Sequence, residues 1–405
     1  MKILIVSSYL PFPLFSGGHI RLFNLLKELS YKHEITLVCE KRDYQKQSDI
    51  QEVEKICKNV FTVNRRKQWS IKNILKTGFS MNPFLIVGHT NLSMKRKIKD
   101  LLQKEKFDVL HAETFYIMQN IPKTKIPIVL AEHNIEYMVY KRFADSKPFF
   151  IKLPFYVDVI KMKRLEENFW KKADKLIAVS EEEKRLMNRK DVVVIPNGVD
   201  IEKFQPKADR PLDDKIKNEK RVLFIGDFKW MQNRDAALWI LKEIWPEIKS
   251  KITHSTSSGQ SSKLNLKLWV VGRNIPESIK KLGDESVIFD ENNQQETQDI
   301  FKDADLLLAP IRIGGGTSFK ILEAMANGCV VVATPLGREG IDAKDNKEIL
   351  VADNVNEIAE KSLNILEDKN FYEKIAKNAR LLIEEKYSWT EIAKRLESVY
   401  NSTTQ

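Results

Sequence analysis

Short apolar runs alternate with longer amphipathic segments along the whole chain. Continuous apolar strands separated by helical stretches are typical of parallel sheets that helices cover on both faces. In the first half the predicted strands are Ile3–Val6, Ile35–Val38, Val60–Val63, Val109–Leu110, Ile128–Leu130, Leu176–Val179 and Val192–Ile195. In the second half they are Val222–Ile225, Leu266–Val271, Val287–Phe289, Leu306–Ala309, Val330–Ala333 and Ile349–Val351. Two such series predict two doubly wound, Rossmann-like α/β domains.

A polar segment separates the two series of strands. Residues Glu202–Lys220 carry two prolines and show no apolar periodicity, which is typical of a linker. The length of 405 residues suits two domains of about 200 residues each. We therefore predict an N-terminal domain over residues 1–201, a linker over 202–220 and a C-terminal domain over 221–387.

Two other segments stand apart from the strand pattern. Residues 388–405 contain Ile392, Leu396 and Val399 at helical spacing, so we expect a closing helix there. Residues 254–262 are rich in Ser and contain one Gly, which indicates a surface insertion without a functional role.

The apolar runs are too short for a membrane protein or a secreted one. None approaches the roughly 18 residues of a membrane-spanning helix, and the first has only four consecutive apolar residues before polar Ser7. That is too short for the core of a signal peptide, so we expect a cytoplasmic protein. Cys39, Cys57 and Cys329 lie far apart, which argues against a zinc or redox site.

Basic residues are concentrated in one stretch of the first half. The chain has 67 Lys and Arg against 56 acidic residues, and Arg65–Lys106 alone holds eleven basic and two acidic residues. Such a stretch is either a solvated helix surface or a contact with an anionic partner. Because Trp69, Phe79 and Phe84 lie among the charges and no nucleic-acid motif accompanies them, we favour the anionic inner face of a membrane over nucleic acid.

The clearest chemical signal is a glycine turn in the second half. The predicted strand ends near Pro310, the glycines Gly314, Gly315 and Gly316 follow, and a helix then runs to Gly328. The first amides of a helix are free and its dipole favours an anion. Glycines also allow a diphosphate to approach the backbone closely.

Four side chains around this turn suit a nucleotide. Thr317 adds a hydroxyl donor, and Lys320 and Arg312 are cations that can reach the same anion. Glu323 follows Lys320 by three residues and can accept hydrogen bonds from a ribose. A solvated lysine, and a capping or salt-bridge role for Glu323, are the alternatives.

The stretch Pro310–Ile341 resembles the donor site of family 4 glycosyltransferases, in particular the bacterial exopolysaccharide and sugar-transferase branch with a Gly-Gly-Gly-Thr-x-x-Lys-x-Leu-Glu-Ala pattern. Further segments that resemble the family are Ala178–Glu181, Ile195–Asp200, Phe224–Phe228, Asn233–Ala236 and Val271–Arg273. The resemblance implies two facing Rossmann-like domains, the GT-B architecture. It also implies a nucleotide diphosphate sugar as donor substrate, retention of anomeric configuration, and no metal or other cofactor.

The resemblance extends to the first domain. Gly17 and Gly18 form a glycine turn after the first strand, similar to the family loop that faces the diphosphate. His133 matches the place of a family histidine that contacts the transferred sugar, and with Lys320 and Glu323 it completes the predicted catalytic set. His111, expected to end the preceding strand, is a weaker candidate. A plain turn and a packing histidine are the alternatives.

An Asp-x-Asp sequence at Asp303 and Asp305 has the form of a metal site in another glycosyltransferase fold. It begins a predicted strand, whereas ligands of doubly wound sheets bind at the carboxyl ends. We therefore predict no metal site.

The sequence predicts a glycosyltransferase that moves a sugar to a polysaccharide, glycolipid or lipid-linked glycan. Gly315, Asp227 and Gln232 stand where many family members carry charged residues. These departures leave a non-catalytic nucleotide-sugar binder as one alternative, and a nucleotide-sugar epimerase of the same two-domain fold is the other.

Overall fold

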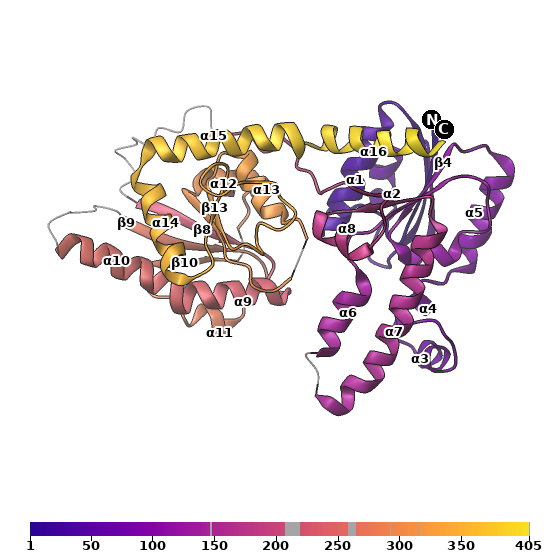
Figure 1. Ribbon diagram of the computed structural model, residues 1–405, viewed down its shortest axis with the longest axis horizontal. Coiled ribbons are helices and arrows are strands. Elements are labelled where there is room, and N and C mark those ends of the chain that lie inside the picture. Colours follow the sequence, from indigo (N-terminus) through magenta and orange to yellow (C-terminus); the bar gives the residue numbers. More distant parts are fainter. Residues whose placement is uncertain (146–147, 207–218, 258–264, 292, 315, 405) are drawn as a thin grey trace. The chain divides into compact units, whose positions relative to one another are not determined.

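The chain forms two compact units, which are coloured along the sequence in Figure 1. The computed structural model describes residues 1–145, 148–206, 219–257, 265–291, 293–314 and 316–404. One unit consists of Met1–Pro196 with Ile392–Gln405, and the other of Asn197–Glu391. Each unit contains a parallel sheet with α-helices, which confirms the predicted fold class.

The N-terminal unit contains a seven-stranded parallel sheet in the order β3-β2-β1-β4-β5-β6-β7. Its strands are β1 (Lys2–Ser7), β2 (Glu34–Lys41), β3 (Asn59–Asn64), β4 (Val109–Glu113), β5 (Ile128–Ala131), β6 (Lys175–Ala178) and β7 (Val192–Val194). Its helices are α1 (Gly17–Ser30), α2 (Gln47–Glu54), α3 (Ile71–Gly78), α4 (Phe84–His89), α5 (Leu92–Lys104), the 3₁₀ helix η1 (Phe115–Asn120), α6 (Glu136–Asp145), α7 (Phe149–Lys172) and α8 (Glu181–Met187).

The second unit contains a six-stranded parallel sheet in the order β10-β9-β8-β11-β12-β13. Its strands are β8 (Glu219–Ile225), β9 (Asn265–Val271), β10 (Val287–Asp290), β11 (Leu306–Ala309), β12 (Val331–Ala333) and β13 (Leu350–Val351). Its helices are α9 (Met231–Trp239), the π-helix η2 (Ile240–Ile244), α10 (Trp245–Ser257), α11 (Glu277–Lys280), α12 (Thr297–Asp303), α13 (Phe319–Ala326), α14 (Val355–Glu367) and α15 (Lys369–Lys386). The last helix, α16 (Trp389–Thr404), confirms the predicted closing helix.

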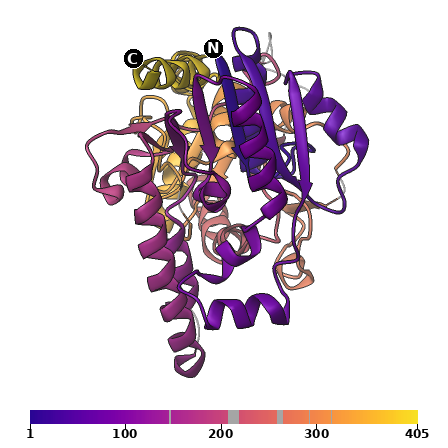
Figure 2. The same ribbon diagram turned by 90° about the vertical axis from the view of Figure 1, so that its right-hand side faces the viewer.

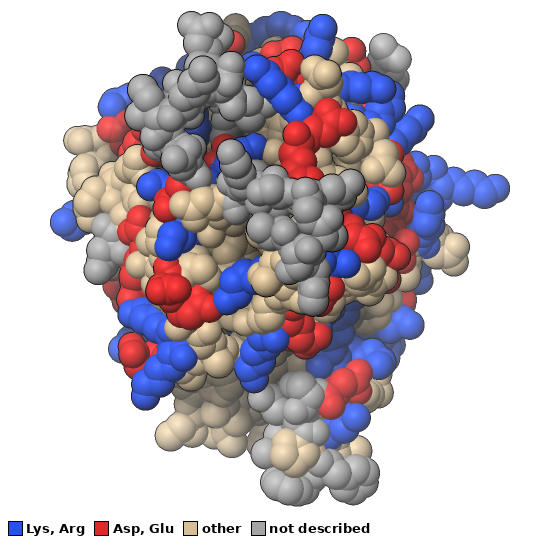
Figure 3. Space-filling model, turned by 90° about the vertical axis from the view of Figure 1, so that its left-hand side faces the viewer, with Lys and Arg blue, Asp and Glu red and all other residues tan. Residues whose placement is uncertain are grey.

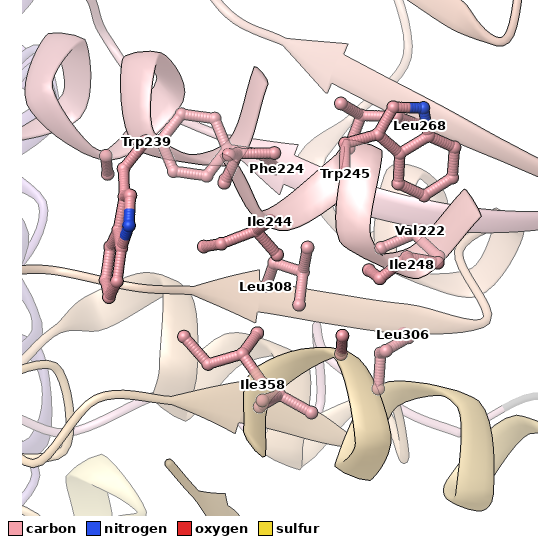
Figure 4. Close-up of a cluster of buried hydrophobic side chains, with 14 of the residues drawn as sticks. Val222, Phe224, Trp239, Ile244, Trp245, Ile248, Leu268, Leu306, Leu308 and Ile358 are labelled. Carbon is pink, nitrogen blue, oxygen red and sulfur yellow. The ribbon is translucent and has the colours of Figure 1, made fainter. Parts of the chain in front are cut away.

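The central positions of strands such as β8 and β11 are continuously apolar because both faces of each sheet are covered. Val222 and Phe224 of β8 pack into one core cluster, whereas Leu223 between them packs into another. Leu306 and Leu308 of β11 join the first cluster in the same way (Figure 4). Successive side chains of a strand point to opposite faces, so a continuous apolar run serves two layers of helices.

The strand order places both candidate sites at topological switch points. In the N-terminal unit the order reverses between β1 and β4, and in the second unit between β8 and β11. The crevice outside the carboxyl ends of such strands is where doubly wound sheets bind ligands. The predicted residues Gly17 and Gly18 follow β1, and Gly314 and Gly316 follow β11.

Both predicted ends of the linker differ from the bounds in the structure. The compact units divide between Pro196 and Asn197, ahead of the predicted linker. Glu219 and Lys220 were expected in that linker but already belong to β8, because their backbones pair with β9 although their side chains are polar. Residues 207–218 of the linker and 258–262 of the predicted insertion lie outside the described residues.

Candidate active site

The glycine turn of the second unit leads from β11 into α13. Gly314 and Gly316 have φ angles of +122° and +82°, a region that favours glycine. Gly315 lies outside the described residues. Ser318 precedes α13 but does not cap it with its side chain, and the amides of Phe319 and Lys320 donate to no acceptor within the described part of the chain. Free amides at a helix N-terminus provide an anion site.

Thr317 carries a buried hydroxyl beside these amides. Its side chain is only 7% exposed, and its Oγ1 has no hydrogen-bond partner among the described residues. Gly340 packs against it, because a Cβ at that position would lie 2.6 Å from Oγ1. A buried hydroxyl without a partner costs about 1–3 kcal/mol, so this group is suited to a ligand that supplies the missing bond.

Lys320 points from the first turn of α13 towards β8. Its Nζ donates to Oδ1 of Asn233 at 2.9 Å and lies 5.0 Å from the ring centre of Phe224. Asn233 is itself held by a bond from Nδ2 to the carbonyl of Asp227. Burial lowers the pKa of Lys320 to about 8, and the nearby Glu323 opposes that shift. This cation therefore loses its proton far more readily than an exposed lysine.

Glu323 lies one turn further along α13. Burial raises its pKa to about 7, although Lys203 and Lys320 act in the opposite direction. No ion pair joins it to Lys320 among the residues described, so the salt-bridge alternative receives no support. A half-buried carboxylate that has no hydrogen-bond partner among the described residues can accept bonds from the hydroxyls of a ligand.

The side chains of Arg312 and Lys320 have different partners. Its guanidinium binds the carboxylate of Asp235 with two bonds of 3.0 and 3.1 Å, and it lies 4.4 Å from the ring centre of Trp239. Both partners belong to α9. The role of Arg312 as a second cation for the anion would require this ion pair to open.

In the N-terminal unit, three residues meet at the carboxyl edge of the sheet. Glu113 is the last residue of β4, in register with Ser7 of β1 and Ala131 of β5. His133 follows β5, and its Nε2 lies 2.6 Å from Oε1 of Glu113. A Cβ on Gly18 would lie 3.6 Å from Nδ1 of His133, so the predicted residues Gly18 and His133 are neighbours.

Glu113 also binds a second histidine. Nε2 of His111 lies 2.7 Å from Oε2 of Glu113, and the hydroxyl of Tyr400 in α16 lies 2.8 Å from Nδ1 of His111. Burial alone would raise the pKa of Glu113, but the charge of His133 and the hydrogen bonds from His111 and His133 hold it well below its ordinary value. An ionised Glu113 accepts from both Nε2–H groups, which leaves Nδ1 of His133 on the side of Gly18.

Some of these residues were missed from the sequence. His111 was expected to end its strand, but β4 continues to Glu113, so this prediction was wrong. Gly17 and Gly18 are the first residues of α1 rather than a turn ahead of it. Neither Glu113 nor Asn233 was assigned a role. The polar residues after Leu110 suggested that the strand had ended, although β4 is buried throughout.

The Asp-x-Asp sequence lies where it was predicted, at the amino end of β11. Oδ2 of Asp305 accepts a hydrogen bond from the amide of Arg221 at 2.7 Å. Within the described ranges, no group of three His, Cys, Asp or Glu residues is arranged to hold a metal ion. The same part of the chain has no helix both long and apolar enough to cross a membrane.

Comparison with protein families assigns most of the chain. A model described as Glycosyltransferase Family 4 matches residues 15–203, and one described as Glycosyl transferases group 1 matches residues 219–368. The chain belongs to the family 4 glycosyltransferases. The second match contains the α13 site, and the first contains Glu113 and His133.

Individual relatives have low sequence identity, but the similarity extends over most of the chain. An uncharacterised 44.6 kDa protein of the cps region of Klebsiella pneumoniae is 23% identical over 398 residues, which cover 95% of this chain and 96% of that protein. The phosphatidyl-myo-inositol mannosyltransferase of Mycolicibacterium smegmatis is 25% identical over 323 residues, or 76% and 75% of the two chains. The crystal structure of Anabaena HepE with UDP and glucose superposes with a TM-score of 0.64 at 14% identity, over 99% of this chain and all of that one. The glycosyltransferase therefore has the GT-B fold.

Proposed function

We propose that this glycosyltransferase takes a sugar from a nucleoside diphosphate sugar held at the start of α13 and transfers it with retention of configuration and without a metal. Four features support a diphosphate and ribose site: the cation of Lys320 and, within the described ranges, the free amides that begin α13, the unpartnered hydroxyl of Thr317 and the unpaired carboxylate of Glu323. HepE, which shares the fold, was crystallised with UDP and glucose.

The observation that carries this proposal is that Lys320 stands in the first turn of α13, whose first two amides donate to no acceptor in the described part of the chain. Cleavage of a sugar–diphosphate bond builds negative charge on the departing phosphate. Preorganised amides and a cation stabilise such charge without reorganisation at the moment of reaction. In this proposal His133 contacts the transferred sugar, and Glu113 fixes the orientation of the His133 imidazole ring.

We further propose a glycan or lipid-linked acceptor and a place of action at the inner face of a membrane. The K. pneumoniae relative comes from a cps region, and the M. smegmatis relative is named for a phosphatidyl-myo-inositol acceptor. Both favour an acceptor used in making surface polysaccharide or glycolipid.

The direct test is a thermal-shift screen with UDP, GDP, ADP and their sugars, followed by transfer assays with the sugar that binds. A ligand that binds the folded state at 100 times its Kd adds about 2.7 kcal/mol of stability. We expect one nucleoside diphosphate to raise the unfolding temperature of the wild type but not of Lys320→Ala. If no nucleotide shifts the wild type, the proposal is wrong.

The pH dependence of nucleotide binding should follow Lys320. Because its pKa is lowered to about 8, the cation is present below that pH and is lost as the pH rises through it. Glu323, with a pKa of about 7, becomes an acceptor for the ribose above that value. We expect the affinity for the diphosphate, measured by calorimetry from about pH 6 to pH 9, to peak between these values and to fall by up to about tenfold per pH unit on the alkaline side.

The control for this profile is Lys320→Arg, which keeps its charge to higher pH. It should abolish the alkaline decline even if the absolute affinity is lower. An unchanged decline in this variant would assign the titration to another group.

Thr317→Val separates ligand binding from stability. Removing a buried hydroxyl that has no partner in the described part of the chain should leave the free energy of unfolding unchanged or slightly higher, whereas nucleotide affinity should fall by about tenfold. Thr334→Val is the matched control, because the hydroxyl of Thr334 is also buried but bonds the carbonyl of Ile311 and the amide of Gly337. That control should lose about 1–3 kcal/mol of stability. A marked loss of stability in Thr317→Val would show that its hydroxyl serves the fold.

A further inference from the structure

Around α3 of the N-terminal unit, large apolar side chains point outwards. Trp69 is 76% exposed, Ile71 79% and Phe79 91%, and Leu75 and Met81 are more than half exposed. Ile71, Leu75 and Phe79 recur at the spacing of one helix face, so the apolar side of α3 faces away from the core. Single exposed apolar residues are ordinary, but a contiguous group marks an interaction site.

The polar side of this region fixes that orientation. Nζ of Lys161 in α7 donates to the carbonyls of Thr77 and Ser80, both at 2.8 Å. At the other end of α3, the side chain of Ser70 accepts a bond from the amide of Asn73. The Asn73 side chain in turn donates to the carbonyl of Gln68 at 2.9 Å. Because polar bonds hold both ends of α3, its apolar side is presented by a defined structure.

Helix α7 adds a second outward apolar row. Leu153, Val157 and Ile160 are exposed and follow one another at helical spacing. Ile160 immediately precedes Lys161, the residue that holds α3. In both ribbon views, α3 and the N-terminal part of α7 extend to the same end of the N-terminal unit (Figures 1 and 2). We call these two exposed rows, with Trp69 and Met81, the docking face.

The charge in the sequence of α3 and its flanking residues is of one sign. From Arg65 to Met81 the sequence has five Lys or Arg and no acidic residue. On the face seen in Figure 3, by contrast, basic and acidic side chains are interspersed. An anionic lipid surface attracts each nearby Lys or Arg by roughly 1 kcal/mol.

We propose that the docking face inserts shallowly into an anionic lipid bilayer, with the apolar rows among the acyl chains and the basic residues at the headgroups. Tryptophan and other large apolar residues flanked by cations are the composition of interfacial membrane segments. The proposal rests on the proposed function in one respect only: binding to the bilayer would bring the enzyme to its lipid-linked acceptor.

The test is sedimentation of the full chain with vesicles of phosphatidylcholine alone or mixed with phosphatidylglycerol. The wild type should bind the mixed vesicles, and less so when salt is raised from about 0.05 to about 0.5 M. Ile71→Ser with Phe79→Ser should lower the partition coefficient by about tenfold or more. The matched control is Ile288→Ser with Leu381→Ser, which removes exposed apolar side chains of the second unit and should bind as the wild type does.

Several results of the sedimentation assay would contradict the proposal. Absence of wild-type binding to the mixed vesicles, equal binding to neutral vesicles, or full binding by the Ile71→Ser, Phe79→Ser variant would overturn the proposal. A lipid-free dimer in ultracentrifugation that this variant abolishes would also overturn it, in favour of a second copy of the chain. Nucleotide thermal shifts on the same preparations test the proposed function separately, because they require no lipid.

Discussion

Lys320→Ala is expected to lower turnover by about a hundredfold or more while the protein stays folded. Lys320 lies in the first turn of α13, whose first two amides donate to no described acceptor, and its ammonium group bonds Oδ1 of Asn233. Truncation removes the cation of that first turn, so the negative charge that develops on the departing diphosphate loses a stabilising positive charge. The measurement is the rate of nucleoside diphosphate release in the presence of acceptor.

Two controls accompany this variant. Lys302→Ala removes a partly exposed lysine of α12 that pairs with Asp299, and its turnover should equal that of the wild type. The unfolding midpoint of Lys320→Ala should not fall, because a lysine whose pKa is lowered by burial pays a desolvation cost for its charge. Turnover near the wild-type rate would remove Lys320 from the mechanism and leave the amides of α13 to bind the phosphates.

The fold was largely predictable because both faces of each sheet are buried. A strand such as Leu306–Ala309 must then be apolar at every position, and its predicted and observed bounds coincide. The glycine turn was predictable for a related reason, since positive φ angles at Gly314 and Gly316 restrict those positions to glycine. Local conformational requirements of this kind restrict the residue types at the positions concerned, so they can be recognised in the sequence.

Interactions between distant residues were not predictable in the same way. Glu113 bonds His133, twenty positions away, and His111 bonds Tyr400, 289 positions away. The pairing of Arg312 with Asp235 likewise spans 77 positions. Nothing in the local sequence pattern shows that the carboxylate of Glu113 bonds two histidines. The basic stretch shows the same limit, because the sequence places apolar residues among the basic ones there but does not show which side of α3 faces the core.

Glu113→Gln is expected to lower turnover by about ten- to a hundredfold and to cost about 2–4 kcal/mol of folding stability. The carboxylate accepts one N–H from His111 and one from His133. A glutamine keeps the shape but replaces one acceptor oxygen with an NH₂ donor, so one histidine must change its tautomer or lose its bond. His133 would then no longer present Nδ1 in a fixed orientation.

The neighbouring Glu132 provides a matched control. It is buried as Glu113 is, and its two oxygens accept hydrogen bonds from the amide of Phe115 and from Nε1 of Trp170. Glu132→Gln likewise replaces one acceptor oxygen with an NH₂ donor, so it should also cost stability. Turnover should change little, in contrast to Glu113→Gln, because in the described part of the chain the Glu132 side chain bonds neither His111 nor His133. Urea unfolding at pH 7 and turnover under the same conditions measure both effects.

A double-mutant cycle tests whether Glu113 acts through His133. If the carboxylate only positions the histidine, Glu113→Gln should add little to the turnover loss of His133→Ala. The pH dependence of stability gives a second readout. Because the pKa of Glu113 is lowered in the folded state, its contribution is present above the ordinary glutamate pKa and is lost as the pH falls through the folded value. The wild type should thus lose its stability advantage over Glu113→Gln only in strong acid, and additive turnover losses would mean that Glu113 has a role of its own.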